Sequence, residues 1–148
     1  MTGPGELAAS GPRATGHADA LRAAIDAVHD GHQHHYGPEQ HVDPTHDRDL
    51  ALLHGDRRYA DGLAALAELG DLTAIAELAD VISLCAQAHA AGDADLAEAV
   101  WTAGATAIGW GETPELVGAK TRARAGQGDA ADALRDAADR VRRPSPHG

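Results

Sequence analysis

The sequence predicts an all-α protein, a helical bundle of about five to six helices with short connections. Three observations predict this class. Phe is absent and aromatic residues make up 3% of the 148 residues, so Ala, Leu, Ile and Val must form the core, and alanine-rich sequence favours helix. Apolar residues recur at intervals of three and four, the spacing of one helical face. No segment alternates apolar and polar residues over the length of a strand.

Composition divides the chain into three parts. Residues 1–16 carry Gly-Pro-Gly and Ser-Gly-Pro, and such clusters predict a flexible leader. A single helical domain is expected over residues 17–143, a length that allows a real buried core. Residues 144–148, Pro-Ser-Pro-His-Gly, predict a flexible tail.

The first helix is predicted over residues 18–30, where Leu21, Ile25 and Val28 share one face. Gly31 is expected to end this helix, because glycine is a common residue at helix ends. A histidine-rich loop should follow it.

The second helix is predicted to begin near residue 45 or 47 and to end at Leu69, with Gly70 as its stop. Gly55 and Gly62 interrupt its apolar pattern, and each costs about 1 kcal/mol relative to alanine. A glycine kept inside a helix usually has a packing reason, so close contacts are expected at both positions.

The later helices are predicted from their capping residues and glycine stops. Two of them should cover residues 71–92 and 93–111. A short helix should start at Thr113-Pro114, because proline is favoured in the first helical turn. The last should run from about residue 129 to 142, where Pro144 follows its end.

Charge and composition exclude several classes of function. The formal net charge is −11 and the chain has a single lysine, Lys120, so nucleic acid is not an expected partner. No apolar stretch reaches the roughly 20 residues that span a bilayer. The single cysteine, Cys85, rules out an internal disulfide and predicts a cytoplasmic protein.

Histidines mark the segment most suited to binding. Seven of the ten histidines lie between residues 29 and 54. His29, His32 and His35 are spaced three residues apart, with Asp30 beside the first. Imidazole and carboxylate together suit zinc, nickel or copper, so these three histidines are the candidate metal ligands. A solvated histidine-rich loop with incidental metal affinity is the alternative.

The segment from Asp26 to Gly70 resembles the trans-isoprenyl (polyprenyl) diphosphate synthases. That family is all-α and carries Asp-Asp-x-x-Asp on a helix, then Arg-Arg-Gly, then Gly-Asp at the start of the next core helix. In this chain Asp-Ala-Val-His-Asp stands at residues 26–30 in the place of the first motif, and His-Tyr-Gly stands at 35–37 in the place of the second. Leu-Leu-His-Gly-Asp-Arg-Arg-Tyr-Ala at 52–60 is similar to the Gly-Asp helix.

The departures from the family bear on catalysis. Ala27 replaces the second aspartate, and His35 and Tyr36 replace the two arginines that hold diphosphate. The second aspartate-rich motif has no credible counterpart, and the chain is about half the usual family length. Ionisation of an allylic diphosphate needs several Mg²⁺ ions between two carboxylate clusters. The resemblance therefore implies a truncated relative that does not catalyse prenyl transfer.

Three functions follow from these observations. The first is a non-catalytic, isoprenyl-diphosphate-synthase-like helical protein that acts as a subunit or homodimeric scaffold, because in that family the helices around the Gly-Asp segment build the dimer interface. The second is a small histidine-rich protein that binds a transition metal or another ligand. The third is a repurposed enzyme that binds a diphosphate, with or without Mg²⁺, through Asp26, Asp30 and Arg57. A second copy or another helical protein is the expected partner.

Overall fold

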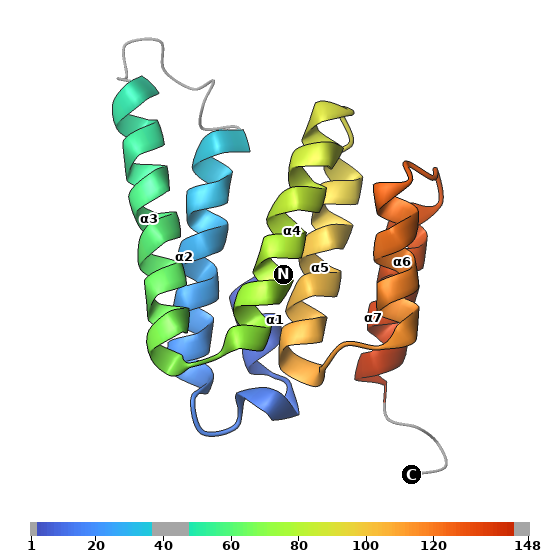
Figure 1. The fold of residues 1–148 in the computed structure, drawn as a ribbon, viewed down its shortest axis with the longest axis horizontal. Helices are drawn as coiled ribbons and strands as arrows, with labels where there is room; N and C mark the ends of the chain where they lie inside the picture. The colour runs from blue at the N-terminus through green and yellow to red at the C-terminus, as the bar shows by residue number, and fades with distance from the viewer. Residues whose placement is uncertain (1–2, 37–47, 144–148) are drawn as a thin grey trace.

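The computed structural model describes residues 3–36 and 48–143, except for the side chains of residues 35, 36, 48, 49 and 51. Within these ranges the chain forms helices and no strand, so the predicted all-α bundle is confirmed (Figure 1). The elements are α1 (Pro4–Ala9), the 3₁₀ turn η1 (Pro12–Ala14), α2 (Ala18–Tyr36), α3 (Arg48–Leu69), α4 (Leu72–Ala90), α5 (Ala94–Trp110), α6 (Pro114–Arg124) and α7 (Ala130–Arg142).

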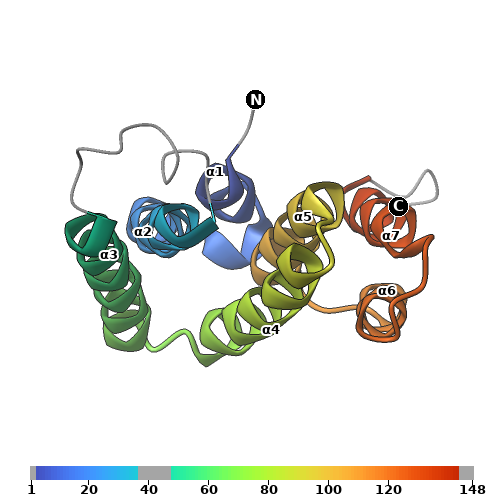
Figure 2. The ribbon, with the colours of Figure 1, turned by 90° about the horizontal axis from the view of Figure 1, so that it is seen from above.

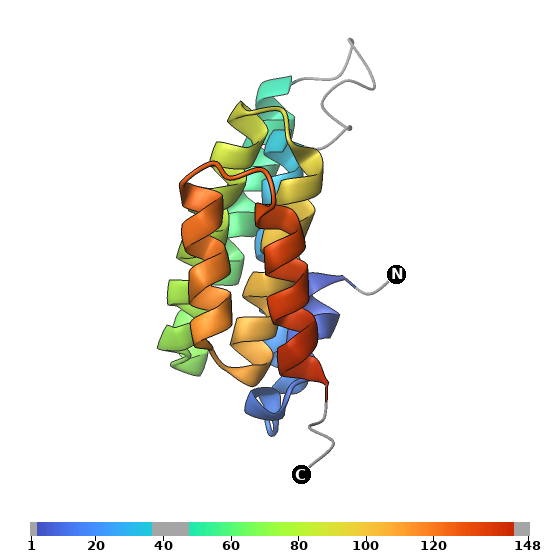
Figure 3. The ribbon, with the colours of Figure 1, turned by 90° about the vertical axis from the view of Figure 1, so that its right-hand side faces the viewer.

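The helices are arranged as a curved row of antiparallel neighbours (Figure 2). The α2–α3 hairpin stands at one end, α4 and α5 lie in the middle, and the α6–α7 hairpin stands at the other end. Viewed from that end, α6 and α7 run side by side in opposite directions (Figure 3). The short α1 packs against both α2 and α5 and so joins the first hairpin to the centre. No described helix is both long enough and apolar enough to cross a membrane.

The core consists mostly of alanines and branched aliphatic side chains, as the composition predicts. Its largest fully buried apolar side chains are Leu21, Ile25, Val28, Leu66, Leu78, Val81, Val100, Leu116 and Leu134. Alanines fill the remaining core positions and allow neighbouring helices to approach closely. Trp101 on α5 is the one tryptophan in this described core.

The N-terminal segment differs from the flexible leader that the sequence predicts. Residues 4–9 form a helix and residues 12–14 a 3₁₀ turn, and Ala8 and Ala14 are fully buried. The clusters of Gly and Pro mark helix starts here, because Pro4 occupies the first turn of α1. Small residues explain the packing: a Cβ at Gly5 would lie 2.6 Å from the carbonyl oxygen of Arg22. Among the described helices, α1 is the one that the sequence did not predict.

The expected end of the first helix at Gly31 is also wrong. Helix α2 continues to Tyr36, and Gly31 lies where α2 crosses α3. A Cβ at Gly31 would lie 2.5 Å from the carbonyl oxygen of Gly55, and one at Gly62 would lie 2.6 Å from that of Ala24. The glycines at 31, 55 and 62 therefore serve a close crossing of two helices. Histidines predicted to lie in a loop are consequently part of a helix.

The remaining helices lie close to their predicted limits. Gly70 follows α3 with a φ of +71°, the left-handed conformation expected of a glycine stop. The side chains of Asp71, Asp93 and Thr113 each accept a hydrogen bond from a backbone N–H in the first turn of α4, α5 and α6. The segment 37–47, with the rest of the predicted histidine-rich loop, and the predicted tail at 144–148 lie outside the described residues.

Candidate functional site

The two aspartates predicted to bind a ligand lie on α2 and already have partners within the chain. Asp26 accepts a hydrogen bond of 3.2 Å from the backbone N–H of Gly5, and Arg22 lies 3.9 Å away on the same helix. Asp30 accepts a hydrogen bond of 3.0 Å from Nε of Arg58 on α3. Both carboxylates are about half exposed and serve to attach α1 and α3 to α2.

Arg57, the arginine predicted to bind with them, is exposed on α3. Its neighbour Arg58 makes the ion pair with Asp30 instead. Successive residues of a helix are rotated by about 100°, so only one of two adjacent arginines can face α2. The structure therefore does not bring Asp30 and Arg57 together as a pair.

The histidines of α2 meet a tryptophan in the middle of the bundle. The ring of His29 lies edge-on to Trp101 of α5, with centroids 4.7 Å apart, and the ring of His32 lies 5.6 Å from the same indole. His89 of α4 lies 5.5 Å from His32, between ring centroids. The predicted ligands His29 and His32 thus lie in an aromatic junction between α2, α4 and α5. The side chain of the third, His35, is outside the description.

Burial affects the protonation of His29. Removal of the His29 ring from water lowers its pKa, although the nearby Asp26 and Asp30 carboxylates oppose that change. A neutral imidazole is the form that binds metals. Among the described residues, however, no three histidine nitrogens come within 4.8 Å of one another, the separation at which three ligand atoms could share one ion. His29 and His32 instead pack against the indole of Trp101, and His32 also lies beside His89.

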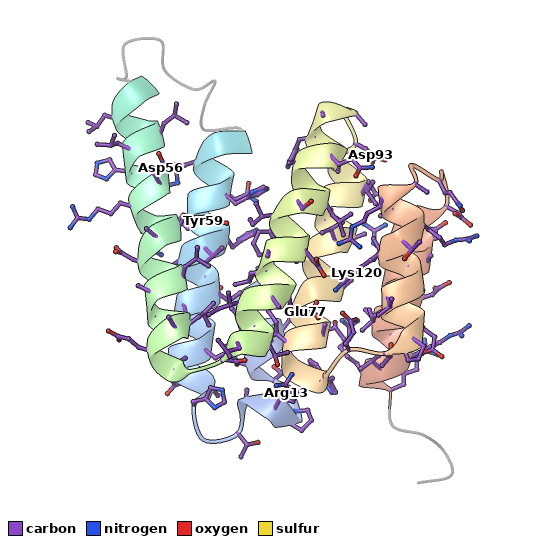
Figure 4. The ribbon with its side chains drawn as sticks, viewed as in Figure 1. Arg13, Asp56, Tyr59, Glu77, Asp93 and Lys120 are labelled. Atoms are coloured by element: carbon purple, nitrogen blue, oxygen red, sulfur yellow. The ribbon has the colours of Figure 1, made fainter. Side chains whose placement is uncertain are left out.

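A second polar cluster, which the sequence did not predict, surrounds Lys120 of α6. This side chain is buried, with 5% of its surface exposed. Its Nζ donates to Glu77 Oε2 at 2.5 Å, to Glu112 Oε2 at 2.7 Å and to Asp80 Oδ2 at 3.2 Å. Glu77 and Lys120 approach one another from α4 and α6 (Figure 4). Arg124 also bonds Asp80, at 2.9 Å.

The ammonium group fills the space between the carboxylates. The three acidic groups place an oxygen each within 4.8 Å of one another, and all three accept hydrogen bonds from Lys120. An ammonium has three N–H donors, so its hydrogen-bonding capacity is fully used. The cluster is therefore an ion-paired connection between α4, α6 and the segment that carries Glu112.

The carboxyl of Glu77 is the electrostatically unusual group. Burial and the hydrogen bond with Glu112 raise its pKa to about 7, against the opposing effect of Lys120. Burial alone would lower the pKa of Lys120, but its bonds with Glu112 and Glu77 outweigh that effect and raise it. The sequence held one signal of this cluster, because Lys120 is the single lysine of a strongly acidic chain.

Comparisons with protein-family models, with curated proteins and with solved structures found no match to this chain.

Proposed function

We propose that this protein is a non-catalytic helical subunit, a truncated relative of the isoprenyl diphosphate synthases, that associates with a second copy of itself. The observation that supports this proposal best is the outer face of α3, which exposes large apolar side chains. Leu53 is 67% exposed there, and Leu72, just after the α3–α4 turn, is 76% exposed. Such residues are common at subunit interfaces, where burial of an apolar side chain contributes about 1.5–3 kcal/mol.

The outer face of α3 is also suited to pairing with itself. Leu53, Arg57, Ala60, Ala64 and Glu68 are all exposed and fall on one side of the helix. The two alanines leave room for a second helix to approach closely. Arg57 and Glu68 are eleven residues apart, about three helical turns, so they share this side.

An antiparallel two-fold pairing uses both charges. With the axis between residues 62 and 63, Arg57 of each copy faces Glu68 of the other, and Leu53 lies toward the α3–α4 corner of the other copy, which carries Leu72. This complementarity is local, and it offsets the repulsion expected between two chains of net charge −11. We therefore place the interface on α3 and the α3–α4 corner.

The aspartates of α2 support a non-catalytic role. Asp26 and Asp30 are engaged by Gly5 and Arg58 at 3.2 and 3.0 Å, so binding a Mg²⁺–diphosphate would require both contacts to break. Arg57 pairs with Glu68 of the second copy in the proposed interface and is not available to bind diphosphate. In this proposal the residues at the positions of the family's first aspartate-rich motif hold helices together.

The test is the molar mass in solution, measured by light scattering after size exclusion. We expect the wild type to be a dimer with the same molar mass in the presence and absence of EDTA, and Leu53→Asp to be a monomer. Val117→Asp is the matched control, because Val117 is 49% exposed on α6, at the other end of the row. A wild-type monomer, or a Leu53→Asp variant that stays dimeric while Val117→Asp does not, would refute the proposal.

A charge exchange tests the pairing itself. Arg57→Glu and Glu68→Arg should each weaken the dimer, and the double variant should recover it, because each copy then again offers one group of each sign. Two single variants with unchanged dissociation constants would remove the proposed geometry. Mg²⁺ with pyrophosphate provides the last arm: a rise in melting temperature that Asp30→Ala abolishes would favour the diphosphate-binding enzyme instead.

A further inference from the structure

We propose that the cluster around Lys120 is a pH-operated clasp. While the cluster carries one proton, it holds α6 and the α5–α6 connection against α4, and this contact loosens when the proton is lost. This inference concerns a different part of the molecule from the proposed α3 interface. Its basis is the number of charged groups that α4, the α5–α6 connection and α6 bring together and the low solvent exposure of Glu77 and Lys120.

The charges in the cluster come from three elements. Helix α4 contributes Glu77 and Asp80, the α5–α6 connection contributes Glu112, and α6 contributes Lys120 and Arg124. With every group ionised, three negative charges face two positive ones. One proton makes the cluster neutral. Because an uncompensated charge is costly in a buried place, the geometry favours uptake of that proton.

Glu77 is the group that should hold the proton. Its side chain is 9% exposed, whereas that of Glu112 is 30% exposed and that of Asp80 is 40% exposed. Asp80 also has a second cation, Arg124, to balance it. Glu77 and Glu112 both accept hydrogen bonds from Lys120 and place carboxylate oxygens within 4.8 Å of one another, so a proton on Glu77 removes the repulsion between two negative charges.

Loss of the proton should act on Glu112 and hence on α6. Two adjacent carboxylates repel one another, and Glu112 has access to water that Glu77 lacks. Movement of Glu112 into solvent would free the start of α6. The other end stays attached, because the side-chain amide of Gln87 donates to the carbonyl oxygens of Ala123 and Arg124 at 3.0 and 3.1 Å and does not titrate.

The direction of the pH effect follows from the raised pKa of Glu77, from an ordinary 4.5 to about 7. Between these values the folded chain holds a proton that the unfolded chain does not, so acid favours the folded state. The contribution is complete below about pH 4.5 and is lost as the pH rises to about 7. Each unit of pH in this window changes the folding equilibrium constant by up to about tenfold.

The experiment compares Glu77→Gln with wild type. Glutamine keeps a hydrogen-bonding group of the same shape and cannot lose a proton. Glu115→Gln is the control, because Glu115 is an exposed glutamate in the first turn of the same α6. Denaturant unfolding from pH 4.5 to 8.5 should show the fall in wild type and Glu115→Gln, and a flatter profile in Glu77→Gln.

Two further readouts locate the effect. Amide hydrogen exchange in the first turns of α6, corrected for the intrinsic pH dependence, should quicken in wild type above pH 7 and stay slow in Glu77→Gln. The side-chain carbon resonance of Glu77 should titrate near neutrality. A Glu77→Gln profile as steep as wild type, or a Glu77 resonance that titrates near its ordinary value, would overturn the inference. If Glu77→Gln does not fold, Glu112→Gln tests the same proton.

Discussion

Alanine at Gly31 should destabilise the protein, although alanine is the better helix former. The position lies within α2, where alanine by itself gains about 1 kcal/mol over glycine. Against this gain, the new Cβ would lie 2.5 Å from the carbonyl oxygen of Gly55 and 2.8 Å from the backbone nitrogen of Tyr59. Both atoms belong to the main chain of α3, so no side-chain rotation relieves the overlap.

The two helices must therefore move apart along their whole crossing. Overpacking of this kind costs about 1–3 kcal/mol, and separation also loosens contacts at Gly62, where α3 meets Ala24 of α2. After the gain in helix propensity, Gly31→Ala should lower the free energy of unfolding by up to about 2 kcal/mol. The expected fall in melting temperature is up to about 8 °C for a domain of this size.

Gly118→Ala is the matched control because Gly118 also lies within a helix, α6, but has nothing within 4 Å of an added Cβ. It should raise the free energy of unfolding by about 1 kcal/mol. Urea unfolding followed by circular dichroism measures both changes, and equal slopes would show that the denatured states are comparable. If Gly31→Ala stabilises the protein as much as Gly118→Ala does, α2 and α3 do not approach one another closely at Gly31 and the reasoning is refuted.

Two further predictions concern capping and protonation. Asp93→Ala removes the acceptor that caps α5 at the backbone N–H of Leu96 and should lower the free energy of unfolding in urea by about 1 kcal/mol. Asp132→Ala is the comparison, because it removes an aspartate of α7 that is not the N-cap residue. Burial lowers the pKa of His29, so the unfolded chain binds the proton more readily, and the contribution of this group to stability is lost as the pH drops below about 6.5. Measured in the Glu77→Gln background, where the opposing slope is absent, His29→Gln should remove this loss from the pH-dependent unfolding profile, and an unchanged loss would assign it to other groups.

The contributions of His29 and Glu77 to the pH dependence of stability have opposite signs, so they oppose one another below about pH 6.5. His29 contributes above its ordinary pKa, whereas Glu77 contributes below its raised one. The two groups belong to different junctions, the first between α2 and α5 and the second between α4 and α6. Each variant should therefore remove its own contribution to the pH profile and leave the contribution of the other group in place.

Local sequence was sufficient for much of the fold. Helices α4 to α7 lie close to their predicted limits because their caps and stops act within a few residues of the helix ends. Asp93 accepts a hydrogen bond from Leu96 three residues later, and Gly70 adopts its positive φ directly after α3. The all-α class likewise follows from apolar spacing and alanine content, which need no knowledge of the partner helix.

Only the tertiary structure decided what the glycines and charges do. Gly31 resembles a helix end in the sequence but lies within α2, because its partner is Gly55 on another helix. Arg58 and not Arg57 reaches Asp30, since the crossing of α2 and α3 selects one of two equivalent residues. Lys120 meets Glu77 across 43 residues of sequence. Propensities and caps act over one turn of chain, whereas close approach and ion pairing depend on which surfaces the folded chain brings together.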